Sequence, residues 1–136
     1  MAAEEDGEDK PLTVAGDQSG VGRVVVRGRT YEVEWGSEAP PEAGFVESFS
    51  LKSLRFPLQI RGWSPGDRIK LSFGSKKLKK VFSEARVPLG ERSEIPVVVD
   101  GSGRVIWACG LARSVLALPS PDAEPFFLGI RDVCER

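Results

Sequence analysis

The sequence predicts a β-rich α+β domain, in which short strands form a sandwich-like arrangement with one short basic amphipathic helix. Apolar and polar residues alternate in many short runs between glycine, proline and serine clusters, which is typical of strands joined by turns. A single segment, residues 76–85, instead has apolar residues at helical spacing. Because 136 residues suffice for one domain, we expect an acidic tail or linker at 1–20 and a single domain at 21–136.

The predicted tail, "MAAEEDGEDKPLTVAGDQSG", is acidic and rich in small residues. It has too few large apolar side chains to offset the entropy lost on ordering. We therefore expect residues 1–20 to be a mobile tail.

Two hairpins are the clearest strand predictions. "RVVVRGRTYEVEW" has two β-rich runs around Gly28, and "IPVVVDGSGRVIWACG" has two largely buried runs around a turn at 100–103. Further strands are expected in "SFSLKSLRFPLQIRGW", with a bend before Pro57, and in "RSVLAL" and "PFFLGIRDV". The result is a predominantly β domain.

The predicted helix follows a strand, "RIKLSF", in which Ile69, Leu71 and Phe73 would share one face. Ser75 is a suitable N-cap, and the apolar stripe of the helix consists of Leu78, Val81, Phe82 and Ala85. The lysines of "GSKKLKKVF" would then lie in its first two turns.

Charge is unevenly distributed along the chain. The whole sequence has a net charge of −1, but residues 51–92 contain eleven Lys/Arg and three Asp/Glu, a net charge of +8. Lysines near a helix N-terminus oppose the helix dipole, whereas the free N–H groups there favour an anion. The cluster indicates either a binding surface for a polyanion or a solvated helix face.

Residue types exclude several kinds of site. The chain has no histidine, which removes the usual general base and all histidine-containing metal sites, and we predict no catalytic residue and no metal site. Cys109 and Cys134 are too few for a zinc ribbon, and they are either reduced thiols or a disulfide pair. No apolar run approaches the ~20 residues of a membrane span, so we expect a soluble cytoplasmic protein without a membrane partner.

Several side chains beside the lysines suit an anionic partner. Four arginines bracket the predicted helix, and their planar guanidinium groups fit phosphate in a bidentate manner. Trp63 lies in a turn, where it either stacks on a base or packs over the domain core. Asp67 is expected to cap that turn or to pair with an arginine.

The run "RGWSPGDRIKLSFGSKKLKKVFSEARVPLGERSEIPVVVDGSGRVIWACGLARS" resembles the C-terminal domain of bacterial tRNA(Ile)-lysidine synthetase. The resemblance covers residues 49–114 and rests on P-G-D-R, K-K-L-K-x-x-F, the P-V-V-V-D-G hairpin and a closing G-L-R-R-S pattern. Ser64 and Ala112 stand where many members have arginine. The family shares this domain with the phenylalanyl-tRNA synthetase β subunit.

The resemblance implies a tRNA-binding domain that engages the acceptor stem, while a catalytic domain uses ATP and Mg²⁺ to form lysidine at the wobble cytidine of isoleucine tRNA. The family's ATP loop, S-G-G-x-D-S, does not occur in this sequence, so no cofactor is expected here. The side chains that would contact tRNA are Arg61, Arg68, Lys76, Lys77, Lys79, Lys80, Arg86, Arg92 and Arg113.

A second hypothesis is a protein-interaction module. Its basic face would dock on an acidic partner, such as a separate catalytic subunit, or on the chain's own "EEDGED" segment.

Overall fold

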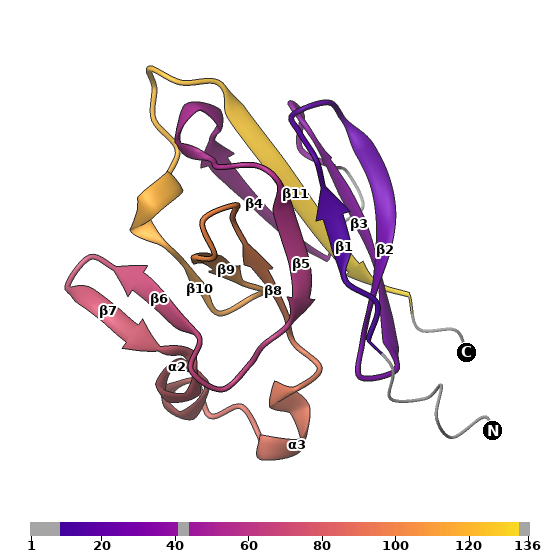
Figure 1. Ribbon diagram of the computed structural model, residues 1–136, viewed down its shortest axis with the longest axis vertical. Coiled ribbons are helices and arrows are strands. Elements are labelled where there is room, and N and C mark those ends of the chain that lie inside the picture. The colour runs from indigo at the N-terminus through magenta and orange to yellow at the C-terminus, as the bar shows by residue number, and fades with distance from the viewer. Residues whose placement is uncertain (1–8, 41–43, 134–136) are drawn as a thin grey trace.

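The computed structural model describes residues 9–40 and 44–133. It contains two β-sheets that face each other, with two short helices beyond the larger sheet (Figure 1). The smaller sheet has the strand order β2-β3-β11-β4, and the larger has the order β1-β5-β8-β9-β6-β7, with β10 pairing with β9. The predicted β-rich α+β class is confirmed.

The elements have the following bounds. The strands of the smaller sheet are β2 (Gly20–Val26), β3 (Arg29–Gly36), β4 (Phe45–Ser50) and β11 (Pro125–Asp132). Those of the larger sheet are β1 (Leu12–Val14), β5 (Leu58–Gly62), β6 (Arg68–Leu71), β7 (Gly74–Lys77), β8 (Pro96–Val99), β9 (Val105–Ala108) and β10 (Ala112–Arg113). The helices are α2 (Leu78–Glu84) and α3 (Leu89–Arg92), and the 3-10 turns are η1 (Leu51–Ser53) and η2 (Val115–Ala117).

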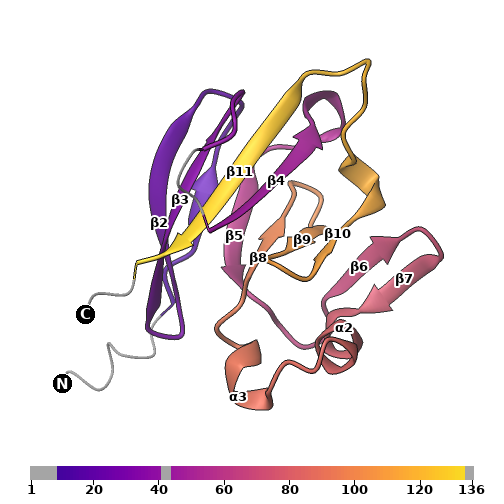
Figure 2. The same cartoon turned by 180° about the vertical axis from the view of Figure 1, so that it is seen from behind.

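Both predicted hairpins are present. β2 and β3 pair antiparallel around Gly28, whose positive φ of 82° suits the tight turn. β8 and β9 pair around the turn at 100–103. Figure 2 shows β11 and β4 running side by side. Val98 of β8 and Ile106 of β9 share a core with Phe49 of β4 and Phe126 of β11, so the middle of the larger sheet is covered by the smaller one.

The larger sheet is buried on both faces at its centre. Val98 and Ile106 belong to the core between the two sheets, whereas Val97, Val99 and Val105 belong to a second core beneath α2. Because side chains on neighbouring positions of a strand point to opposite faces, β8 and β9 contribute residues to both cores. The chain therefore forms three layers, with the smaller sheet, the larger sheet and α2 in that order.

The predicted tail at 1–20 includes residues that belong to the folded domain. Leu12–Val14 form β1, which pairs with β5, and Val14 is buried in the core between the sheets. Lys10 also pairs with Val25 through two backbone hydrogen bonds. Pairing with an existing sheet edge orders a segment that lacks enough apolar residues to order itself. Residues 1–8 lie outside the described part of the chain.

Some local details differ from the prediction. The strands β4 and β5 lie on either side of the bend at Pro57, as expected, but residues 51–53 between them form the 3-10 turn η1, and the middle of "RSVLAL" forms η2 instead of a strand. α3 was not predicted, because its four residues are too short to show a helical period.

Phe82 anchors α2 to the larger sheet. Its side chain is fully buried among Ile69, Val97 and Leu78, and Trp63 packs against it edge to face, with ring centroids 5.1 Å apart.

We expect Phe82→Ala to lower the free energy of unfolding by about 3–5 kcal/mol, because a large cavity would remain beneath α2. Urea unfolding would measure this loss. Leu89→Ala, which alters an exposed side chain of α3, should change stability by no more than about 0.5 kcal/mol. Equal effects of the two variants would contradict this role of Phe82.

Cys109 is free and buried, and burial raises the pKa of its thiol to about 12. At pH 8 about one thiol in ten thousand would be ionised, and the thiolate is the reactive form. In a Cys134→Ser background we therefore expect very slow reaction with iodoacetamide when the protein is folded and rapid reaction in guanidinium chloride. Rapid alkylation of the folded protein would show that this thiol is accessible. Cys134 itself lies outside the described residues.

Candidate nucleic-acid interface

The basic residues of the 51–92 block are carried by the β6–β7 hairpin and by α2. In β6, Ile69 is buried beneath α2 while Arg68 and Lys70 are exposed, as strand alternation requires. The chain then turns at 72–73, and Gly74 takes a positive φ of 129° as it enters β7. This hairpin extends from the edge of the larger sheet (Figure 1).

The helix begins two residues later than predicted. Lys76 and Lys77 are extended and pair with Ile69 and Arg68, and Lys77 itself is the N-cap residue, without a side-chain capping bond. Strand pairing with β6 thus prevails over the helical tendency of these lysines. Ser75 is not the N-cap.

One of the backbone N–H groups at the start of α2 is used within the protein. The backbone N–H of Leu78 donates to the carbonyl oxygen of Asp67 at 2.9 Å, so this group is already occupied. Lys79 and Lys80 are exposed on the helix, whereas Leu78, Val81 and Phe82 are buried. The side chains of Lys79 and Lys80 therefore place positive charge at the surface in the first turn of α2.

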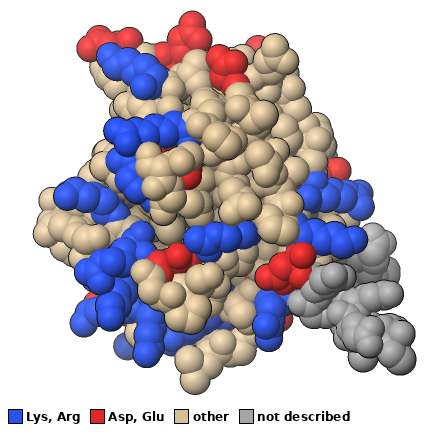
Figure 3. Space-filling model, in the orientation of Figure 1, with Lys and Arg blue, Asp and Glu red and all other residues tan. Residues whose placement is uncertain are grey.

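The hairpin and α2 enclose a shallow hollow of about 670 Å³, which we call the lysine hollow. Five of the nine predicted contact residues line it. They are Arg68, Lys76, Lys77, Lys79 and Lys80. Figure 3 shows Lys and Arg side chains gathered over this part of the molecule, at the lower left.

Within the lysine hollow the cations differ in their partners. Lys76 forms an ion pair with Glu84 of α2, and the hydrogen bond from Lys76 lowers the pKa of the Glu84 carboxyl. Lys77, Lys79 and Lys80 make no ion pair with any other residue of the described segments. Three lysines therefore keep their charge available for an external anion.

Arg61 is committed to the turn that precedes β6. Its guanidinium nitrogens lie 3.0 and 3.1 Å from the two carboxylate oxygens of Asp67, and it also donates to the carbonyl oxygen of Gly62 at 2.7 Å. Asp67 in turn accepts from the backbone N–H of Ser64 at 2.7 Å. The interpretation of Asp67 as a turn cap and arginine partner is confirmed.

The other three predicted arginines do not line the hollow. Arg113 of β10 donates to Glu47 at 2.6 Å and to the carbonyl oxygen of Ser48 at 3.0 Å, which ties it to β4. Arg92 of α3 donates to the carbonyl oxygen of Val87 at 2.9 Å. Arg86 is exposed just after α2, in a left-handed backbone conformation with φ of 60°.

Of the two aromatic residues near the hollow, Trp63 follows the second of its two predicted alternatives, whereas Phe73 does not lie where the sequence predicts it. Trp63 is half-buried against Phe82 and covers the core beneath α2. Phe73, expected on the buried strand face, lies beyond the end of β6 and is 71% exposed. It lines the lysine hollow, with the Lys76 ammonium 5.3 Å from its ring centroid. Its position between Ser72 and Gly74, two turn-forming residues, was the signal that the strand ends before it.

The described residues contain no cluster of three or more His, Cys, Asp or Glu side chains that could hold a metal ion. Across the same residues, none of the helices has the length and apolar character required to cross a membrane.

Comparison with known proteins identifies the domain that carries this surface. Residues 58–122 match the family model described as the TilS substrate C-terminal domain. The chain is 42% identical over 105 residues to tRNA(Ile)-lysidine synthase of Bacillus subtilis, covering 73% of this chain and 22% of that enzyme. It is 48% identical over 58 residues to the same enzyme of Exiguobacterium sibiricum, covering 43% of this chain and 14% of that enzyme.

Solved structures agree with this assignment. A crystal structure of a TilS C-terminal domain superposes with a TM-score of 0.70 at 26% identity, covering 93% of this chain and all of that one. An N-terminal fragment of the phenylalanyl-tRNA synthetase β subunit from Pyrococcus horikoshii shares the fold, with a TM-score of 0.52 at 13% identity over 62% of this chain and 27% of that one. The chain thus spans about a fifth of the length of its Bacillus subtilis relative, and it contains the C-terminal domain of the tRNA(Ile)-lysidine synthase family.

Proposed function

We propose that this domain binds tRNA, and that it contacts phosphates of the acceptor stem through the lysine hollow. In this proposal the domain supports ATP-dependent lysidine formation on isoleucine tRNA, with ATP and Mg²⁺ bound by a catalytic domain that bears the S-G-G-x-D-S loop. The observation that carries the proposal is the set of unpaired lysines on β7 and α2, within a domain whose relatives are named for this tRNA.

Binding would be driven by charge and shape. Each lysine that neutralises a phosphate releases a condensed counterion, so affinity falls steeply as salt rises. Flexible ammonium groups on an open surface suit backbone phosphates, which carry no sequence information. An A-form stem is recognised mainly by its shape and backbone, which matches such a surface.

The competing hypothesis, a basic face that docks on an acidic protein or on "EEDGED", has less support. Asp9 is the acid of that segment that lies within the described residues. Its carboxylate accepts from the backbone N–H of Arg27 at 2.8 Å, at the β2–β3 turn. Asp9 is therefore bound away from the lysine hollow, which is built from β6, β7 and α2.

Removing two of the unpaired charges tests the proposal directly. We expect the double variant Lys79→Gln/Lys80→Gln to reduce the slope of log affinity against log salt by about 2, since two phosphate contacts are lost. Filter binding to isoleucine tRNA between low and physiological salt would measure it.

The matched control is Arg23→Gln/Arg27→Gln, which removes the same charge from β2 and its turn and should leave the slope unchanged. A non-cognate tRNA should show the same loss, because the contacts read the backbone. If the Lys79/Lys80 variant and the control behave alike, the lysine hollow does not bind tRNA.

Phe73 supplies the apolar component of this surface. We expect its ring to pack on a base or ribose, so that Phe73→Ala weakens tRNA binding at least about fivefold, the lower range for loss of one stacking contact. Because no charge changes, the salt slope should stay the same. Leu89→Ala removes another exposed apolar side chain and serves as the control. Unchanged affinity of Phe73→Ala would exclude the ring from the interface.

A further inference from the structure

A second basic hollow lies beside the β6–β7 hairpin, next to the β8–β9 turn. It measures about 480 Å³, and its lining includes Arg68, Lys70, Ser75 and Arg104. None of the sequence patterns pointed to Lys70 or Arg104. We propose that this hollow, which we call the arginine hollow, binds a further backbone phosphate of the same RNA, so that the hairpin contacts the RNA from both of its faces. This inference rests on the proposed function.

Strand register places the three cations of the arginine hollow on one face. β6 pairs parallel with β9, with Ile69 opposite Val105, and both of these side chains are buried in the core beneath α2. Since side chains alternate, Arg68, Lys70 and Arg104 lie on the opposite face of the sheet.

That face is open at this end of the sheet. The smaller sheet covers β8 and β9, whereas β6 and β7 extend past it (Figure 1). Arg68 and Lys70 are accordingly exposed, and Arg104 is half-buried. The 3-10 turn η2 contributes Leu116 to the wall of the hollow. The cations are therefore gathered in a concave surface that is not filled by the protein's own packing.

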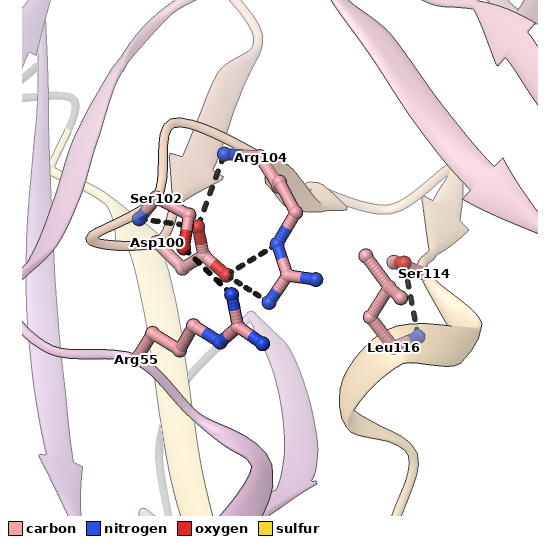
Figure 4. A network of polar contacts seen from close by, with 6 residues as sticks. All are labelled: Arg55, Asp100, Ser102, Arg104, Ser114 and Leu116. Atoms are coloured by element: carbon pink, nitrogen blue, oxygen red, sulfur yellow. Dashed lines mark hydrogen bonds and ion pairs between the residues drawn. The ribbon is translucent and has the colours of Figure 1, made fainter.

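Arg104 is held in place before any ligand arrives. Its Nε and Nη2 atoms donate to one carboxylate oxygen of Asp100 at 3.0 and 2.8 Å. The other oxygen accepts from the backbone N–H groups of Ser102 and Arg104 at 2.9 and 3.0 Å. Figure 4 shows this network, with Arg55 approaching Ser102 from the side.

The Asp100 side chain is only 1% exposed, so it acts as a rigid support. The Nη1 atom of Arg104 makes no hydrogen bond to a described residue and remains available. An arginine whose rotamer is already fixed loses less conformational entropy on binding than a free side chain does.

The charge balance of this hollow favours an anion. The Asp100–Arg104 and Asp67–Arg61 ion pairs each contribute no net charge, so Arg68 and Lys70 make the hollow positive. Arg68 and Lys70 make no ion pair with any residue of the described segments. The Ser75 hydroxyl adds a neutral hydrogen-bond donor, a combination suited to a phosphate oxygen.

Continuity with the lysine hollow points to an extended polyanion. Arg68 and Ser75 line both hollows, so the two surfaces meet along the hairpin. In Figure 3 the Lys and Arg side chains continue upward along the left side of the molecule, beyond the lower-left cluster. A single small anion would occupy one hollow, whereas an RNA backbone presents phosphates at intervals and can reach both.

The experiment uses Lys70→Gln, an exposed substitution that should leave the thermal unfolding midpoint unchanged. Filter binding to isoleucine tRNA is expected to show a salt slope reduced by about 1 and an affinity reduced roughly threefold at low salt. The control is Arg23→Gln, which removes one charge from β2. Combined with Lys79→Gln/Lys80→Gln, the reduction in slope should reach about 3, because contacts in the two hollows are separate.

The outcomes separate this inference from the proposed function. If Lys79→Gln/Lys80→Gln lowers the slope but Lys70→Gln matches the Arg23→Gln control, the lysine hollow binds tRNA and the arginine hollow does not. If none of these variants differs from its control, the proposed function fails and this inference fails with it. If Lys70→Gln lowers the slope alone and in combination, both faces of the hairpin contact RNA.

Discussion

The apolar contact between α2 and the far end of the larger sheet determines where every basic side chain of the surface lies. Phe82 and Leu78 pack on Ile69 of β6 and Val105 of β9, and this core fixes the parallel register of the two strands. With that register set, strand alternation directs Arg68 and Lys70 away from α2, and the helix carries Lys79 and Lys80 on its exposed face. The electrostatic surface is therefore a consequence of core packing.

The ion pairs within the basic surface are as important as its net charge, because they decide which cations are free to contact a ligand. Arg61 holds Asp67 in the turn before β6, and Arg104 holds Asp100 in the β8–β9 turn. Arg61 uses both of its terminal nitrogens in these contacts, whereas Nη1 of Arg104 makes no hydrogen bond to a described residue and is available to a phosphate.

Much of the fold could be predicted from residue patterns, because alternation and turn residues are local signals. The β2–β3 and β8–β9 hairpins follow directly from such patterns. The errors around Phe73, Lys76 and Lys77 have two physical causes. For Lys76 and Lys77, strand pairing with β6 is a contact with another segment, and it outweighs the helical spacing that these residues show by themselves. For Phe73, the turn at 72–73 ends β6 before the strand pattern does. The order of Leu12–Val14 likewise depends on the β5 edge.

The candidate site was predictable in charge but not in detail. The cluster of lysines in the sequence is enough to locate the basic surface, because the helical spacing of the apolar residues leaves the lysines on the exposed side. It does not reveal that Arg113 is tied to Glu47 of β4, and it left open whether Trp63 faces the core and which arginine pairs with Asp67. Arg104 was missed because its role depends on β9 lying beside β6, two strands that are far apart in the sequence.

A surface of a few flexible cations is sufficient for the role we propose. In the Bacillus subtilis relative this domain corresponds to about a fifth of the protein. When a weak site is tethered to a second site on the same RNA, its binding becomes intramolecular and is governed by effective concentration, often millimolar for short linkers. Weak, salt-sensitive phosphate contacts can then increase overall affinity for a substrate while each single contact still exchanges rapidly. A deep, sequence-reading pocket would lose this advantage, and the shallow basic hollows on the β6–β7 hairpin are consistent with the weaker mode.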